Sequence, residues 1–256
     1  MTCSDGSVSN NQGSFGWVMS PRNGVRLVKC SGPAHGCDLG DSFRAEAYGV
    51  LSWMMFFTEY SKHQNVRLPT SEEINKLRLP CIQAHADNEG VMTRIATQLS
   101  WKCLSPGCTL APDWGAINQM CEVMKLSLPS TAMEHIKGHQ DSKVPKHKLP
   151  LPAQLNVEAD ESAGDCQKNN KDHDRSMVLR LPANCAQLHA KDTTVTSKHP
   201  SKLRFQMTFP KIQECLIQRN NWSLELFNSI DWDSHRMAIT KTTLPRQFVN
   251  SIFRSF

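Results

Sequence analysis

Glu46 is an acidic residue whose neighbours in the sequence are largely apolar. It lies three residues after Phe43 and four before Val50, so in a helix its carboxylate shares a face with those two side chains. Burying a carboxylate that nothing neutralises costs several kcal/mol, so a proton, a basic side chain or a cation must offset its charge. Arg44 lies on a different face of such a helix, which leaves the neutralising group open.

Three aspartates occupy comparable positions. Asp5 and Asp87 each close a stretch typical of a strand, and Asp160 shares a helix face with Asn156 and Ala163. Each acid also has an ordinary structural interpretation, because Asp5 precedes a glycine as in many turns and the other two can cap or decorate helices. If the four carboxylates converge, they repel one another unless cations are present, and oxygen ligands select Mg²⁺ or Mn²⁺. Two such ions about 4 Å apart form the clamp used for phosphoryl transfer.

The elements that must position these acids begin with a β-hairpin. Bulky side chains alternate with smaller ones over residues 15–19, turn residues follow at 21–24, and a β pattern resumes at 25–28. A short strand that ends in Asp5 precedes the hairpin. The chain is therefore predicted to open with a three-stranded antiparallel meander.

Helices and strands alternate after the meander. The predicted elements are a helix over 41–60, a strand over 81–86, helices over 88–99 and 113–125, a strand over 131–137, a flexible basic loop over 138–151 and a helix over 153–167. Strands interrupted by helices indicate an α/β fold with a mixed sheet covered by helices.

A polar segment over 166–176 follows the last of these helices, and it predicts a domain boundary near residue 170. Residues 1–170 then form one domain. Residues 171–256 form a linker and a mainly helical C-terminal extension, with short strands over 177–195 and helices beyond residue 203. The sequence assigns no role to this extension.

Five short segments resemble type-1 ribonuclease H, and they occur in the order in which that family has them. They are Ser4-Asp5-Gly6-Ser7, Arg44-Ala45-Glu46-Ala47, Ala86-Asp87-Asn88, Ile136-Lys137-Gly138-His139 and Asn156-Val157-Glu158-Ala159-Asp160. The resemblance covers roughly residues 1–170. It implies a ribonuclease H-like five-stranded sheet, with three antiparallel strands followed by parallel ones, flanked by helices.

The same resemblance implies an enzyme, a metal-dependent endonuclease that hydrolyses the RNA strand of RNA/DNA hybrids with two Mg²⁺ ions, for which Mn²⁺ can substitute. Asp5 would bridge both ions, Glu46 and Asp87 would complete their coordination, and Asp160 would hold the ion on the side of the nucleophile. His139 would assist proton movement or product departure.

Hybrid recognition is expected to rest on phosphates and 2′-hydroxyl groups rather than on base edges. The weaker candidates for these contacts are Asn88 and four lysines of the loop that carries His139, namely Lys137, Lys143, Lys146 and Lys148. A solvated loop that offsets nearby acids would have the same composition.

Two departures from the family pattern suggest a retrotransposon reverse transcriptase as the origin of the chain. Only four residues precede Asp5, and segment 101–112 carries Lys102 as its single base. A reverse-transcriptase domain of the same polyprotein is accordingly a predicted partner. Two alternatives stay open, a catalytically degenerate module that binds nucleic acid or connects parts of a polyprotein, and a nuclease of the integrase type that cuts DNA.

Composition agrees with a globular protein but does not select among these functions. The chain has 256 residues, of which 39% are hydrophobic, and a net charge of +5 that is compatible with a polyanionic partner. Because it lacks a secretory signal and any long apolar run, we expect an intracellular protein, cytoplasmic or nuclear, without a membrane partner. Its ten cysteines are expected to be reduced, and neither Cys30-His35-Cys37 nor Cys103-Cys108 has the spacing of a zinc site.

Overall fold

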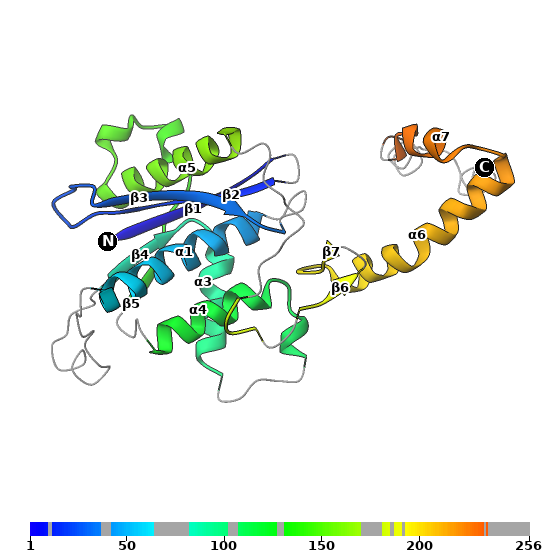
Figure 1. Ribbon diagram of the computed structural model, residues 1–256. Coiled ribbons are helices and arrows are strands. Elements are labelled where there is room, and N and C mark those ends of the chain that lie inside the picture. The colour runs from blue at the N-terminus through cyan, green and yellow to red at the C-terminus, as the bar shows by residue number, and fades with distance from the viewer. Residues whose placement is uncertain are drawn as a thin grey trace, which may run out of the picture. The chain divides into compact units, whose positions relative to one another are not determined.

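A five-stranded mixed sheet forms the centre of the first of two compact units in a computed structural model (Figure 1). The structure describes residues 1–9, 12–36, 42–63, 82–101, 107–126, 131–169, 181–184, 187–190, 193–232 and 234. The strands are β1 (Thr2–Ser9), β2 (Gln12–Met19), β3 (Val28–Ala34), β4 (Ile82–Ala86) and β5 (Thr131–His135). Their order is β3-β2-β1-β4-β5, in which β1, β2 and β3 pair antiparallel while β1, β4 and β5 pair parallel. This confirms the predicted sheet.

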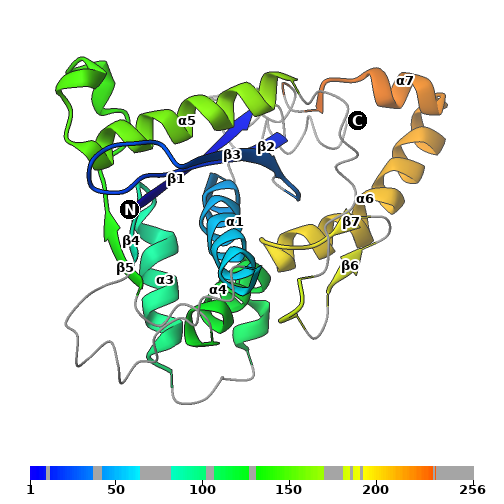
Figure 2. The ribbon, with the colours of Figure 1, turned by 60° about the vertical axis from the view of Figure 1, so that its left-hand side comes forward.

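Helices cover both faces of this sheet, as Figures 1 and 2 show. The four long helices of this unit are α1 (Ser42–His63), α3 (Glu89–Leu99), α4 (Trp114–Leu126) and α5 (Leu151–Asn169). Helix α5 packs on one face, and α1 packs on the other together with α3 and α4. The predicted helices are confirmed, and their bounds differ from the expected ones by at most two or three residues.

The prediction of a strand over 25–28 is wrong for its first three residues. Strand β3 begins only at Val28, while Val25 and Leu27 are exposed. Gly24 adopts a φ of 83°, and the carbonyl of Gly24 accepts a hydrogen bond from Arg26 Nη1. The connection between β2 and β3 therefore turns at Gly24, and the regular antiparallel pairing with β2 begins only at Val28.

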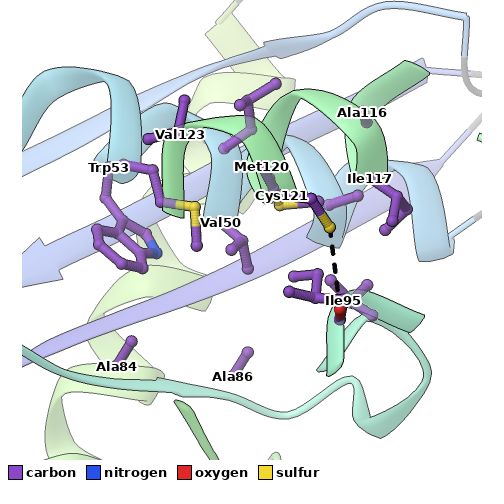
Figure 3. Close-up of a cluster of buried hydrophobic side chains, with 14 of the residues drawn as sticks. Val50, Trp53, Ala84, Ala86, Ile95, Ala116, Ile117, Met120, Cys121 and Val123 are labelled. Carbon is purple, nitrogen blue, oxygen red and sulfur yellow. Dashed lines mark hydrogen bonds between the residues drawn. The ribbon is translucent and has the colours of Figure 1, made fainter. Parts of the chain in front are cut away.

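The alternation along β2 explains how one strand serves two cores. Trp17 lies against α1, where its Nε1 donates to Ser52 Oγ over 3.0 Å, whereas the next residue, Val18, packs against Leu155 of α5. Figure 3 shows part of the larger core, in which side chains of α1, α3 and α4 meet Ala84 and Ala86 of β4. Successive residues of a strand point to opposite faces, so the alternating side chains of β2 contribute to both cores.

Gly6 of β1 allows α1 to approach the sheet closely. A Cβ atom built on Gly6 would lie 2.4 Å from the backbone nitrogen of Glu46 and 2.6 Å from the carbonyl carbon of Ala45. No other residue type fits there without displacing α1. The missing side chain thus brings the first turn of α1, with Glu46, against the strand that carries Asp5.

The described residues between 181 and 199 pack on the same unit. Ala183 donates its backbone N–H to Gln119 Oε1 over 2.7 Å, and Asp113 donates its own to the carbonyl of Thr196 over 2.8 Å. The segment contains the short strands β6 (His189–Ala190) and β7 (Thr193–Thr194). Residues 1–199 form one compact unit. The boundary predicted near residue 170 falls within 170–180, outside the described residues, and stays a prediction.

The second compact unit begins at Pro200 and is helical where it is described. It contains α6 (His199–Asn220), which starts at the end of the first unit, and α7 (Leu224–Ser229). Phe227 is buried between Phe209 and Trp232. These tryptophan and phenylalanine contacts give the unit a small core of its own.

Two features of the described residues bear on other predictions. Within the described ranges, the hydropathy of every helix falls short of what crossing a bilayer requires. Among the described residues, Cys3, Cys30, Cys108, Cys121 and Cys215 are free thiols. Cys37 and Cys103, which belong to the two weak metal patterns, lie outside the described residues.

Candidate metal centre and active site

Three of the predicted acids converge where β4 ends beside β1, in the interior of the sheet. Asp5 lies in β1, Glu46 in the first turns of α1 and Asp87 directly after β4, and one ligand oxygen from each lies within 4.8 Å of the others. Ser4 of β1 pairs with Ala86 of β4 in parallel register, so the residues that follow emerge side by side. The parallel pairing of two strands distant in sequence therefore creates the site.

Asp5 is oriented from two sides. The backbone N–H of Gly6 donates to its Oδ1 over 2.7 Å, and Nδ2 of the buried Asn156 donates to its Oδ2 over 3.2 Å. Sequence reasoning placed Asn156 on the face of Asp160 but did not name it as a site residue. Its position four residues before Asp160 was the signal, because both then face the same way along α5.

Burial raises the pKa of each carboxyl group in this cluster, and repulsion from neighbouring acids raises those of Asp5 and Glu46 further. Burial, followed by the charges of Asp87 and Asp160, raises the pKa of Asp5 to about 8. Burial and then the charges of Asp5 and Asp87 raise the pKa of Glu46 well above its ordinary value, and burial raises that of Asp87. Without a cation the cluster therefore retains protons near neutral pH.

The donor set fits a hard divalent cation. Glu46 Oε2 and Asp87 Oδ1 are buried, and neither has a hydrogen-bond partner within the part of the chain that the structure describes. Orphaned buried oxygens are costly unless something binds them, and three carboxylates without nitrogen or sulfur ligands favour Mg²⁺ or Mn²⁺. Asp5, Glu46 and Asp87 are thus the residues that would hold such an ion.

Asp160 and His139 form a neighbouring pair at the rim of this cluster. His139 Nδ1 lies 3.8 Å from Asp160 Oδ2, and the two side chains are 76% and 43% exposed. The charge of Asp160 contributes to the raised pKa values of Asp5 and Asp87, so it lies within electrostatic reach of both. The structure thus gathers three acids tightly and places the fourth beside the histidine.

The residues predicted to contact nucleic acid lie in different settings. Asn88 caps α3, since its Oδ1 accepts from the backbone N–H of Val91 over 3.2 Å. Lys146 Nζ lies 3.0 Å from Glu161 Oε2 and is engaged on the protein itself. Lys137, Lys143 and Lys148 are exposed on the loop around His139. These three are the loop lysines best placed to meet a polyanion.

Gly138 contacts the acidic cluster directly. A Cβ atom at this position would lie 2.5 Å from Asp87 Oδ2, so we expect Gly138→Ala to displace either the carboxylate or the loop. A misplacement of about 1 Å can lower activity by about 100-fold. Titration with Mg²⁺ should also show weaker binding.

The matched control for this substitution is Gly164→Ala. A Cβ atom at Gly164, within α5, meets nothing within 4 Å, so the variant should bind Mg²⁺ as the unaltered protein does. It should also gain roughly 1 kcal/mol of stability from higher helix propensity. Equal Mg²⁺ affinity in both alanine variants would disprove the role of Gly138.

Comparison with known proteins places this geometry beside solved structures. No protein-family model and no curated protein matches the sequence. Ribonuclease H1 of Halobacterium salinarum is 13% identical with a TM-score of 0.39, over 66% of this chain and 96% of its own. A ribonuclease H1 isolated from compost, solved with an RNA/DNA hybrid, is 11% identical with a TM-score of 0.40, over 65% and 97%. The PFV ribonuclease H domain is 15% identical with a TM-score of 0.39, over 66% and 92%.

The sheet itself decides the fold. Three antiparallel strands are followed by β4 and β5, which add in parallel to the far side of β1. The chain therefore has the ribonuclease H-like sheet that its sequence predicted. In this sheet the acidic cluster lies where β4 ends beside the middle of β1, with α1 and α5 supplying Glu46 and Asn156 from the two faces. The expectation that Asp5 closes its strand is wrong, because β1 continues to Ser9 in antiparallel pairing with β2.

Proposed function

We propose that this protein is a metal-dependent nuclease that hydrolyses the RNA strand of RNA/DNA hybrids. The observation that carries the proposal is the cluster of Asp5, Glu46 and Asp87. One ligand oxygen from each lies within 4.8 Å of the others, and two buried oxygens, Glu46 Oε2 and Asp87 Oδ1, have no hydrogen-bond partner among the described residues. The five sequence segments that resemble type-1 ribonuclease H support it, because these three acids stand at the matching positions.

The residues of the site have distinct roles in the proposed reaction. Asp5, Glu46 and Asp87, together with Asp160, would hold divalent cations, and Asn156 and the Gly6 N–H keep Asp5 oriented. Bound cations, two in the proposed mechanism, would supply charge stabilisation at the phosphate and lower the pKa of the attacking water. His139, whose Nδ1 faces Asp160, exchanges a proton through Nε2 with the leaving 3′-oxygen.

Hybrid binding relies on charge rather than on base reading. Lys137, Lys143 and Lys148 extend into solvent around His139 and contact phosphates of the hybrid. Retrotransposon origin and a reverse-transcriptase partner in the same polyprotein rest on the sequence departures alone and stay predictions.

The test is cleavage of a hybrid labelled on each strand in turn, in Mg²⁺ and separately in Mn²⁺. We expect RNA-strand products with either ion, no products in excess chelator, and intact RNA/RNA and DNA/DNA duplexes. Cleavage of duplex DNA with the hybrid left intact would instead identify a DNA nuclease. Absence of both cleavage and calorimetric Mg²⁺ binding, in protein shown to be folded, would identify a catalytically degenerate module.

A further inference from the structure

The loop that carries His139 is a folded lobe, which we call the histidine lobe (residues 137–149). It was predicted to be flexible, but it contains two 3₁₀ turns, η2 (Gln140–Ser142) and η3 (Lys146–Lys148). Ser142 Oγ donates to the carbonyl of His139 over 2.8 Å, and Gln140 Nε2 donates to that of Lys137 over 2.7 Å. His139 is held with a φ of 49°, in the left-handed region. The lobe therefore has a defined internal structure.

The base of the histidine lobe is fixed to α5 by apolar contacts. Leu149 is buried in a cluster with Ala153 and Val157 of α5, and Ile136 packs against it from the end of β5. Gln154 Nε2 also donates to the carbonyl of Leu149 over 2.8 Å. Figure 2 shows the lobe as the green segment that leads into α5. This cluster holds both ends of the lobe but none of its outer turns.

Lys146 fixes the outer part of the lobe to the same helix. Its Nζ lies 3.1 and 3.0 Å from the two carboxylate oxygens of Glu161 and 3.7 Å from Glu158 Oε1. Glu158 is held in turn by two hydrogen bonds from Arg26, of 3.0 and 2.7 Å, which lower its pKa. Lys146 thus joins a network of four charged groups whose central carboxylate is only 16% exposed.

The contact between His139 and Asp160 is too weak to place the histidine alone. Its 3.8 Å separation and the exposure of both side chains leave it screened by solvent, and exposed pairs of this kind contribute little. The network around Lys146 is more buried and shares one carboxylate between two cations. Because Glu158 and Glu161 flank Asp160 on α5, fixing Lys146 there also fixes the lobe relative to Asp160.

We propose that Lys146 is a positioning residue, which holds His139 beside Asp160 through its ion pairs with Glu161 and Glu158 instead of binding a phosphate. The kinetic effect expected from this assignment rests on the proposed function. The proposal gives Lys146 a different role from Lys148, although both lysines lie in η3 and the sequence predicted the same role for them. The lobe is accordingly a prearranged support for the histidine.

Lys146→Met tests this assignment, with Lys168→Met as the matched control. Lys168 is exposed near the end of α5 and pairs with Asp165, so its removal deletes the same charge outside the site. We expect Lys146→Met to lower kcat for hybrid cleavage by about 10-fold with KM unchanged, within the range for small misplacements. The slope of log Kd against log salt should stay the same, and the control should behave as the unaltered protein does.

Reversal of the ion pair gives a second readout. The double variant Lys146→Glu with Glu161→Lys should recover most of the lost kcat. A raised KM in Lys146→Met, together with a salt slope reduced by roughly 0.9, would mean that Lys146 binds a phosphate and would overturn the proposal. Kinetics identical to those of the unaltered protein would also overturn it.

Amide hydrogen exchange separates failure of this proposal from failure of the proposed function. Exchange over residues 138–149 should accelerate in Lys146→Met, return in the double variant and stay unchanged in Lys168→Met. An unaltered protein that cleaves no hybrid would refute the proposed function, and exchange would still report on the lobe. Unchanged exchange in Lys146→Met refutes the positioning role whatever the activity.

Discussion

Asp87→Asn should abolish hybrid cleavage, with a loss of at least about 100-fold to 1,000-fold, or roughly 3–4 kcal/mol in the barrier. The substitution keeps the shape of the side chain but removes a charge from the cluster of three acids. Asp87 is less buried than Asp5 and Glu46, so this variant is the one of the three that should perturb folding least. Initial rates on a labelled hybrid in Mg²⁺ measure the effect.

The control for Asp87→Asn is Asp165→Asn. Asp165 is an acid of α5 whose side chain is 70% exposed and pairs with Lys168, so its loss should leave the rate unchanged. Calorimetry should show weakened Mg²⁺ binding in Asp87→Asn alone. A folded Asp87→Asn variant that retains a tenth or more of the activity would contradict a metal site at these three acids.

Local periodicity predicted the strands and helices because these depend on patterns of two to four residues, whereas the shared site of the acids was implied by the resemblance to ribonuclease H. The alternation of Trp17 and Val18 determines the two faces of β2, and the spacing of Glu46 from Phe43 and Val50 places its carboxylate inward. Such patterns follow from strand and helix geometry alone. They give the face on which a side chain lies, and the parallel pairing of β1 and β4 brings Asp5, Glu46 and Asp87 together.

Contacts between distant segments could not be predicted in the same way. Asn156 meets Asp5 across 151 positions of sequence, and Arg44 forms a 2.7 Å buried ion pair with Asp113 across 69. Both contacts depend on the positions that α5 and α4 take along the elements on which they pack. No local sequence pattern encodes those positions. The engagement of Lys146 with Glu161 is of the same kind, and for that reason composition placed it among the phosphate-binding lysines.

The acidic cluster should destabilise the metal-free protein as the pH rises. In the folded state burial, followed by neighbouring charges, raises the pKa of Asp5 from 3.8 to about 8, and the pKa values of Glu46 and Asp87 are raised too. The folded chain then binds more protons than the unfolded chain between these values. The contribution of these groups to the free energy of unfolding is therefore fully present below about pH 4 and is lost as the pH rises to about 8.

Glu46→Gln should weaken this pH dependence and raise stability in chelator at pH 8, while it abolishes cleavage. Glutamine stays neutral at every pH, so the burial and the charges of Asp5 and Asp87 that raise the pKa of Glu46 no longer act on an ionisable group at this position. Each kcal/mol gained should raise the melting temperature by about 2–4 °C. Thermal unfolding in chelator from pH 4.5 to 8.5 measures the effect, with Glu122→Gln on α4, an acid paired with Lys125, as the control.

Saturating Mg²⁺ should reverse the order of stability between the two proteins. A ligand at about 100 times its Kd stabilises the folded state by roughly 2.7 kcal/mol, and only the protein with its full set of carboxylates gains this. Parallel pH profiles for the unaltered protein and Glu46→Gln would show that the carboxylates are not coupled. If Mg²⁺ reverses the order of stability but monovalent salt of equal ionic strength does not, the repulsion among these carboxylates is relieved by the divalent ion that the proposed reaction requires.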